Sequence, residues 1–162
     1  FRDFFIKKFN NISQNIAHFG FSLLILSILF NSLFSSEIIT NLKVGETFED
    51  LNTKIILKSI EQKEEKNFKS IVANFNIENS KGIIENLSPE LRIYNQPNII
   101  TSEADIKTTM MSDKFIVINV VQNQDYFNVR YQVKPFMLWI WLSVLLISFG
   151  GFLSFFKKEY EK

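Results

Sequence analysis

Residues 16–34, IAHFGFSLLILSILFNSLF, carry no formal charge apart from any proton on His18. A second run, residues 136–156 (FMLWIWLSVLLISFGGFLSFF), contains no ionisable group at all. A bilayer core about 30 Å thick needs about 20 apolar residues of helix, so each run is long enough to cross it. In a chain of 162 residues, two such runs leave no amphipathic partner that could bury them in a soluble core. The sequence therefore predicts two membrane spans.

Basic residues lie outside both runs: Arg2, Lys7 and Lys8 before the first, and Lys157, Lys158 and Lys162 after the second. Because lysine and arginine near the end of a span favour the cytoplasmic side, we expect both termini there. The expected organisation is a cytoplasmic flank (1–11), a span (12–36), an extracytoplasmic domain (37–134), a second span (135–156) and a cytoplasmic tail (157–162). The chain begins with Phe1 rather than Met, which indicates a fragment, a split-gene product or a trimmed chain.

The segment between the spans has the composition of a β-sheet. Four stretches are rich in Ile, Val, Phe and Tyr: residues 53–60, 68–77, 114–121 and 126–133. In the last of them, Phe127, Val129 and Tyr131 alternate with polar residues, which is typical of a strand with one buried face. The predicted fold is two transmembrane α-helices flanking a small, mostly antiparallel all-β domain of about seven strands.

The connections carry weaker signals. Residues 61–66 (EQKEEK) and 80–82 (SKG) predict solvated turns, and residues 122–125 suit a four-residue hairpin turn. Pro89 and Pro97 predict irregular or edge structure over residues 87–100. Residues 101–109 (TSEADIKTT) favour a short helix capped by Thr101 or Ser102.

The second span has features of a helix that starts at the membrane surface. Pro135 suits its first turn, where the missing N–H costs nothing. Trp139 and Trp141, with Tyr131 before the span and Tyr160 after it, suit an aromatic belt at the headgroup level. Gly150 and Gly151 would permit close packing against another helix.

Composition excludes several kinds of chemistry. The net charge of +1 and the lack of a basic stripe predict no nucleic-acid partner. The chain has no cysteine, which excludes disulfides, thiolate metal sites and a cysteine nucleophile. The domain between the spans has no histidine either, so Ser-His and zinc arrangements are excluded there. We predict no catalytic residue in this domain and expect it to be a binding or spacing module.

His18 is the chain's one histidine, and it lies within the first span. An ionisable side chain in a membrane is costly and indicates a function by default. A single imidazole cannot form a zinc site, but it can supply one axial ligand to haem iron. The alternative is a neutral histidine that hydrogen-bonds a neighbouring helix or faces a headgroup. From the residues alone both interpretations remain open.

Several motifs resemble the C-terminal part of the CcmF family of cytochrome c-type biogenesis proteins, the membrane haem lyase component of a multi-subunit maturation system. They are residues 16–20 (IAHFG), 42–46 (LKVGE), 87–94 (LSPELRIY) with 101–106 (TSEADI), and 134–136 (KPF) with 139–141 (WIW) and 150–151 (GG). Their order and spacing agree with the family over nearly the whole chain. The chain departs from the pattern at Leu91, where a lysine is common, and keeps Arg92.

The resemblance implies that His18 is one of two histidines, on different spans, that bind a b-type haem (haem b) through its iron. The second ligand would lie outside this chain. The membrane haem would keep a delivered haem reduced while thioether bonds form to the cysteines of apocytochrome c. The fragment alone would not be active.

The implied partners are the remainder of CcmF, subunits of the CcmH and CcmI type, a haem chaperone of the CcmE type, apocytochrome c and the lipid bilayer. The implied location is a bacterial inner membrane with a periplasmic domain, or a mitochondrial inner membrane. The other hypothesis is a two-span scaffold without haem, whose outer β domain organises a membrane assembly.

Overall fold

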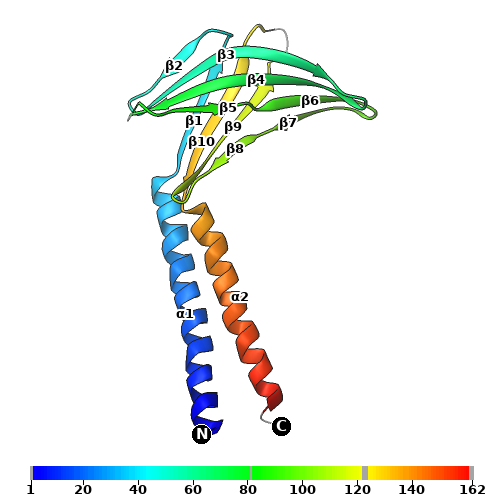
Figure 1. Cartoon of the computed structure of the whole chain (residues 1–162). Coiled ribbons are helices and arrows are strands. Elements are labelled where there is room, and N and C mark those ends of the chain that lie inside the picture. The colour runs from blue at the N-terminus through cyan, green and yellow to red at the C-terminus, as the bar shows by residue number, and fades with distance from the viewer. Residues whose placement is uncertain (1, 81, 122–123, 161–162) are drawn as a thin grey trace. The chain divides into compact units, whose positions relative to one another are not determined.

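A computed structural model of the chain describes residues 2–80, 82–121 and 124–160, with side chains described for residues 12–80, 82–121 and 124–154 (Figure 1). The chain divides into two compact units. The helical unit comprises the two long helices together with residues 109–113, and the β unit comprises residues 36–108 and 114–133.

Two long apolar helices form the helical unit, as predicted. Helix α1 extends over Arg2–Phe34 and α2 over Met137–Tyr160. The stretches long and apolar enough to cross a membrane are Ile12–Phe34 and Met137–Ser154, with mean hydropathy 1.8 and 1.9. The prediction for Pro135 is wrong, because this residue ends a strand and the helix begins two residues later.

The β unit is a sandwich of two sheets. One sheet has the order β1 (Ser36–Leu42), β10 (Phe127–Pro135), β9 (Ser112–Val120) and β8 (Asp105–Thr108). The other has the order β2 (Thr47–Glu49), β3 (Thr53–Glu64), β4 (Phe68–Asn79), β6 (Glu90–Asn95) and β7 (Asn98–Glu103), with β5 (Ile84–Leu87) also paired to β4. The pairs formed by β1 with β10, β3 with β4 and β6 with β7 are antiparallel. The all-β prediction is confirmed, with more strands than the seven expected.

The core lies between the two sheets and follows the period of two that the sequence shows. Its fully buried side chains include Ile55 and Leu57 on β3, Ala73, Phe75 and Ile77 on β4, Ile116 and Ile118 on β9, and Val129 on β10. Tyr131 is also buried in this core, at 4% exposure. Its predicted place in an aromatic belt is therefore wrong: the alternation that places Val129 inside places Tyr131 inside as well.

One predicted turn is largely strand instead. The predicted turn at residues 61–66 is wrong, because β3 continues to Glu64 and pairs there with Lys69 of β4. The turn is shorter, and the Glu65 N–H closes it on the Phe68 carbonyl. Residues 61–64 are polar because this end of the hairpin is exposed to solvent. Polarity there reflects exposure and not a break in pairing.

The two prolines fall in gaps between strands. Pro89 separates β5 from β6, which both pair with β4, and its carbonyl accepts the Ala73 N–H. Pro97 lies in the turn between β6 and β7. Strand β6 is interior, whereas β7 is an edge strand as expected for this region.

The predicted helix at residues 101–109 is wrong. Residues 101–103 end β7, residues 105–108 form β8, and Ala104 lies between them where the chain passes from one sheet to the other. Cross-strand pairing with β6 outweighs a weak helical propensity here. Of the predicted turns, Lys81, Gln122 and Asn123 lie outside the described residues, and Gly82 has the positive φ that suits a turn.

Candidate functional site

Small residues form the contact between α1 and α2. Buried small residues recur every seven positions: Ser13, Gly20 and Ser27 on α1, and Ser143 and Gly150 on α2. A Cβ added to Gly150 would lie 2.8 Å from the Ala17 backbone nitrogen, and one added to Gly20 would lie 3.0 Å from the Ile147 nitrogen. The two backbones are therefore as close as small-residue membrane interfaces allow. The prediction for Gly150 is confirmed, whereas Gly151 faces open space.

This packing determines where His18 points. Ala17 contacts α2, and each further residue turns about 100° around a helix axis. The His18 side chain is exposed and points away from the contact between α1 and α2. Gln14 and Ser22, one turn to either side, are exposed on the same face of α1. The Ser22 hydroxyl donates to the His18 backbone carbonyl at 3.0 Å, so this bond does not involve the imidazole ring.

Polar and aromatic contacts join the helices at the end of α1. The Asn31 side-chain amide donates to the Pro135 carbonyl at 2.6 Å. The rings of Phe30 and Phe136 lie 5.2 Å apart. Phe136 has φ +60°, which is strained for a bulky residue, and its carbonyl accepts the Ile140 N–H as α2 begins. These contacts fix the start of α2 against α1.

The tip of the β8–β9 hairpin belongs to the helical unit. The Phe136 N–H donates to the Met111 carbonyl at 2.8 Å. The Trp139 indole N–H donates to the Met110 carbonyl at 2.9 Å. Of the predicted belt residues, Trp139 therefore has a specific partner and Trp141 is exposed, at 64%. The side chain of Tyr160 lies outside the described residues.

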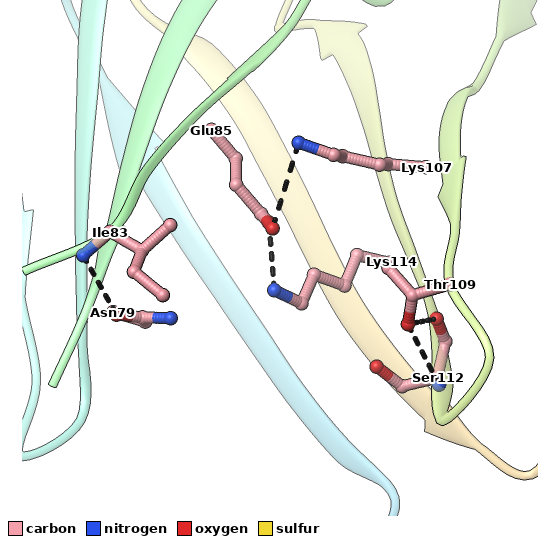
Figure 2. Close-up of polar contacts among 7 residues, drawn as sticks. All are labelled: Asn79, Ile83, Glu85, Lys107, Thr109, Ser112 and Lys114. Atoms are coloured by element: carbon pink, nitrogen blue, oxygen red, sulfur yellow. Dashed lines mark hydrogen bonds and ion pairs between the residues drawn. The ribbon is translucent and has the colours of Figure 1, made fainter. Parts of the chain in front are cut away.

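The β unit contains an ion cluster that joins its two sheets (Figure 2). Glu85 of β5, almost buried, pairs with Lys114 of β9 at 2.8 Å and with Lys107 of β8 at 3.7 Å. Burial, helped by the negative charge of Glu85, raises the pKa of Tyr131 to about 12. Both lysines compensate the glutamate, so the cluster is a satisfied structural network. In the described part of the chain, no three His, Asp or Glu side chains converge as a metal site would require.

Comparison with known proteins assigns the chain to a family. A family described as the CcmF C-terminal beta-sandwich matches residues 33–135. The chain belongs to the CcmF family. The matched residues span the whole β sandwich, so the resemblance seen in the motifs of the sequence is confirmed.

Individual CcmF relatives extend the match into the helices. The chain is 36% identical over 119 residues to the cytochrome c-type biogenesis protein ccl1 of Rhodobacter capsulatus, which covers 74% of this chain and 18% of that protein. It is 29% identical to CcmF of Pseudomonas fluorescens over 148 residues, or 91% of this chain and 22% of the relative. A match of that length must include position 18. The chain spans about a fifth of the length of these relatives.

A solved structure has the same fold. The protein titled "Cytochrome c Heme Lyase CcmF" superposes with a TM-score of 0.71 at 16% identity, over 92% of this chain and 25% of that structure. Two long apolar helices that flank an antiparallel sandwich in the sequence are therefore a fold found in the CcmF family.

The sequence contains a signal for the helix contact in the spacing of its small residues. Ser13, Gly20 and Ser27 are seven residues apart, and that period marks a helix face. No sequence signal indicates that the Met110 and Met111 carbonyls accept hydrogen bonds from Trp139 of α2 and from Phe136 just before it, because backbone groups carry no residue identity.

Proposed function

We propose that this chain is the C-terminal part of a membrane haem lyase component that takes part in the covalent attachment of haem to apocytochrome c. His18 contributes one axial ligand to a b-type haem held in the membrane, and the second ligand comes from another segment. The observation that carries the proposal is the position of His18: a lone imidazole in a span of a CcmF-family chain, on the face of α1 that α2 leaves open.

The residues around His18 fit a haem edge. The imidazole is exposed, and a neutral imidazole has one ring nitrogen free to ligate iron. Ser22 is small and its hydroxyl is bound back to the helix, so one turn beyond His18 no large side chain blocks a flat ring. Farther along the same face, Ile25 and Leu29 are exposed and apolar, which suits a porphyrin and excludes water from it.

The chain's own part in the mechanism is to hold the imidazole in place. Gly20 and Gly150 bring the helix backbones into contact immediately beside His18, which fixes the rotation of α1. A ligand fixed in orientation, in an apolar surrounding, tunes the reduction potential of the iron that it binds. When bound, the haem would supply one-electron transfer to the haem that is being attached.

The proposed setting follows from charge and from the family. The basic flanks favour a cytoplasmic position for both ends of the chain at an inner membrane, with the β unit in the periplasm. Partners there are the remainder of CcmF, a chaperone of the CcmE type, subunits of the CcmH and CcmI type, and apocytochrome c. For the β unit we propose a docking role, because Arg92 and Lys114 are paired internally with Glu90 and Glu85, and no three His, Asp or Glu side chains converge among its described residues.

The test is the absorbance spectrum of the purified membrane protein. His18→Ala is expected to lose the Soret band of a b-type haem. The matched control is Ile28→Ala on the same helix: Ile28 is also exposed, and it lies about 15 Å farther along the axis. A wild-type spectrum in His18→Ala contradicts the assignment of the ligand. A wild-type protein without haem supports the scaffold alternative.

A further inference from the structure

We propose that the turn between β8 and β9 is a membrane-contacting element, with Met110 and Met111 inserted among lipids at the headgroup–acyl boundary. Nothing in haem ligation requires this contact, and it extends beyond the proposed function. In this chain the predicted anchors of the second span are tryptophans. The turn between β8 and β9, which precedes this span in the sequence, is proposed as a second anchor.

The turn is tightly closed. The Thr109 N–H donates to the Ser112 carbonyl at 3.0 Å. The Thr109 hydroxyl donates to the same carbonyl at 2.8 Å (Figure 2). The Ser112 N–H donates to the Thr109 hydroxyl oxygen at 3.1 Å. Met110 and Met111 are the two residues enclosed by these bonds. Their backbone is thus held in one conformation while their side chains project from the tip.

The composition of this turn is unusual. Turns favour Gly, Pro, Asn, Asp and Ser, for conformational reasons and because water surrounds them. The turn between β3 and β4 contains Glu65, Lys66 and Asn67, which are all polar. In the β8–β9 turn, Met110 and Met111 are 69% and 62% exposed within the described structure. Two adjacent exposed thioether side chains form an apolar surface whose contact with water is unfavourable.

Hydrogen bonds place the turn at the start of a membrane span. The Met110 carbonyl accepts the Trp139 indole N–H, and the Met111 carbonyl accepts the Phe136 N–H. Span residues begin at Met137, so the turn lies beside the first helical turn of α2. Tryptophan at the end of a span marks the headgroup level, with its N–H directed to a polar partner. The methionines are therefore at the depth where flexible apolar side chains meet lipid.

The contact has a consequence for α2. Phe136 directly precedes the span and is a bulky residue with a strained positive φ, and the N–H groups at the start of a helix lack partners within that helix. The Met111 carbonyl accepts the Phe136 N–H, which holds this residue where α2 begins.

The experiment measures the depth of the turn in a bilayer. The chain has no cysteine, so Met111→Cys and, independently, Met110→Cys take a single environment-sensitive fluorophore once any cysteines in the rest of the protein are replaced by serine. The protein is reconstituted in phosphatidylcholine nanodiscs. Quenching is measured with lipid spin-labelled near the headgroup and with aqueous iodide. The reference is Leu51→Cys, an apolar residue 94% exposed in the turn before β3.

We expect several-fold stronger quenching by the spin-labelled lipid at positions 110 and 111 than at the reference, and several-fold weaker quenching by iodide. Quenching by iodide at the reference level, without lipid quenching, overturns the proposal and makes the turn a water-exposed loop. Protection from both quenchers also overturns it and shows that a protein segment covers the methionines. Two labelled positions keep the test valid if one variant does not fold.

Discussion

The contact between α1 and α2 can be tested by adding one methyl group to a glycine. At Gly150 the added Cβ would lie 2.8 Å from the Ala17 nitrogen and 2.9 Å from the Ser13 carbonyl oxygen. Both are backbone atoms, and neither can move without displacing α1. At Gly151, the next residue, an added Cβ meets nothing within 4 Å. The pair of variants Gly150→Ala and Gly151→Ala thus changes the same atom in two different surroundings.

The magnitude follows from two opposing effects. Replacing glycine by alanine in a helix stabilises it by about 1 kcal/mol, and this gain is common to both variants. Forcing an extra carbon into a close-packed contact costs about 1–3 kcal/mol. We therefore expect Gly150→Ala to be less stable than Gly151→Ala by about 1–3 kcal/mol, because the propensity gain cancels in the difference. Gly20→Ala, whose Cβ meets Ile147 at 3.0 Å, should fall between them.

The assay is reversible unfolding of the protein in mixed micelles, followed by circular dichroism as the fraction of denaturing detergent rises. The haem spectrum of each variant is measured in parallel, because Ala17 contacts α2 and adjoins the proposed ligand His18. We expect Gly150→Ala to perturb the haem spectrum and Gly151→Ala to leave it unchanged. Equal stability of the two variants, or a more stable Gly150→Ala, would refute the close helix contact.

Three further predictions concern other parts of the chain. Glu85→Gln removes both ion pairs of the inter-sheet cluster and leaves Lys114, 17% exposed, with an uncompensated charge. It should lower the free energy of unfolding, measured with denaturant, by about 3 kcal/mol. The control Glu64→Gln, in an exposed pair with Lys69, should have no measurable effect. Burial raises the pKa of Tyr131 to about 12, above the value of 10 for a free tyrosine. Neutral Tyr131 therefore stabilises the fold fully below pH 10, and this contribution is lost as the pH rises from 10 to about 12; an alkaline titration of tyrosine absorbance should show one group with a midpoint near 12, absent in Tyr131→Phe, and an unchanged titration in that variant would contradict the assignment. Asn31→Leu removes the bond to the buried Pro135 carbonyl and should destabilise the protein by about 1–3 kcal/mol, while Ser32→Ala, an exposed neighbour, should not.

The spans and the sandwich could be predicted because their signals are properties of single segments. An apolar run of sufficient length needs no partner to be recognised, and neither does alternation such as Val129 and Tyr131 around Arg130. The same local reasoning gave the wrong structure at residues 61–64, where charged residues form the exposed end of a long hairpin. It also failed at Pro135, which ends β10 and does not begin α2. At residues 61–64 the outcome depends on pairing with the next strand, β4, and at Pro135 it depends on the extension of β10, which pairs with the distant strand β1.

For the candidate site, the sequence predicted the residue but not its surroundings. His18 is recognisable because one histidine in an apolar run is conspicuous. Its direction depends on Gly150, more than 100 residues away, because that glycine brings Ala17 against α2. Likewise, Met110 and Met111 carry no turn signal, and only the bonds to Trp139 and Phe136 show their place beside a span.

The most direct test of the proposed ligand uses chemical rescue. His18→Gly removes the imidazole and leaves a space that free imidazole can enter. We expect the purified variant to lack the low-spin b-type haem spectrum and added imidazole to restore it. Ile28→Gly, treated identically, should show the wild-type spectrum with and without imidazole. A His18→Gly protein with the complete wild-type spectrum in the absence of imidazole would contradict the central claim.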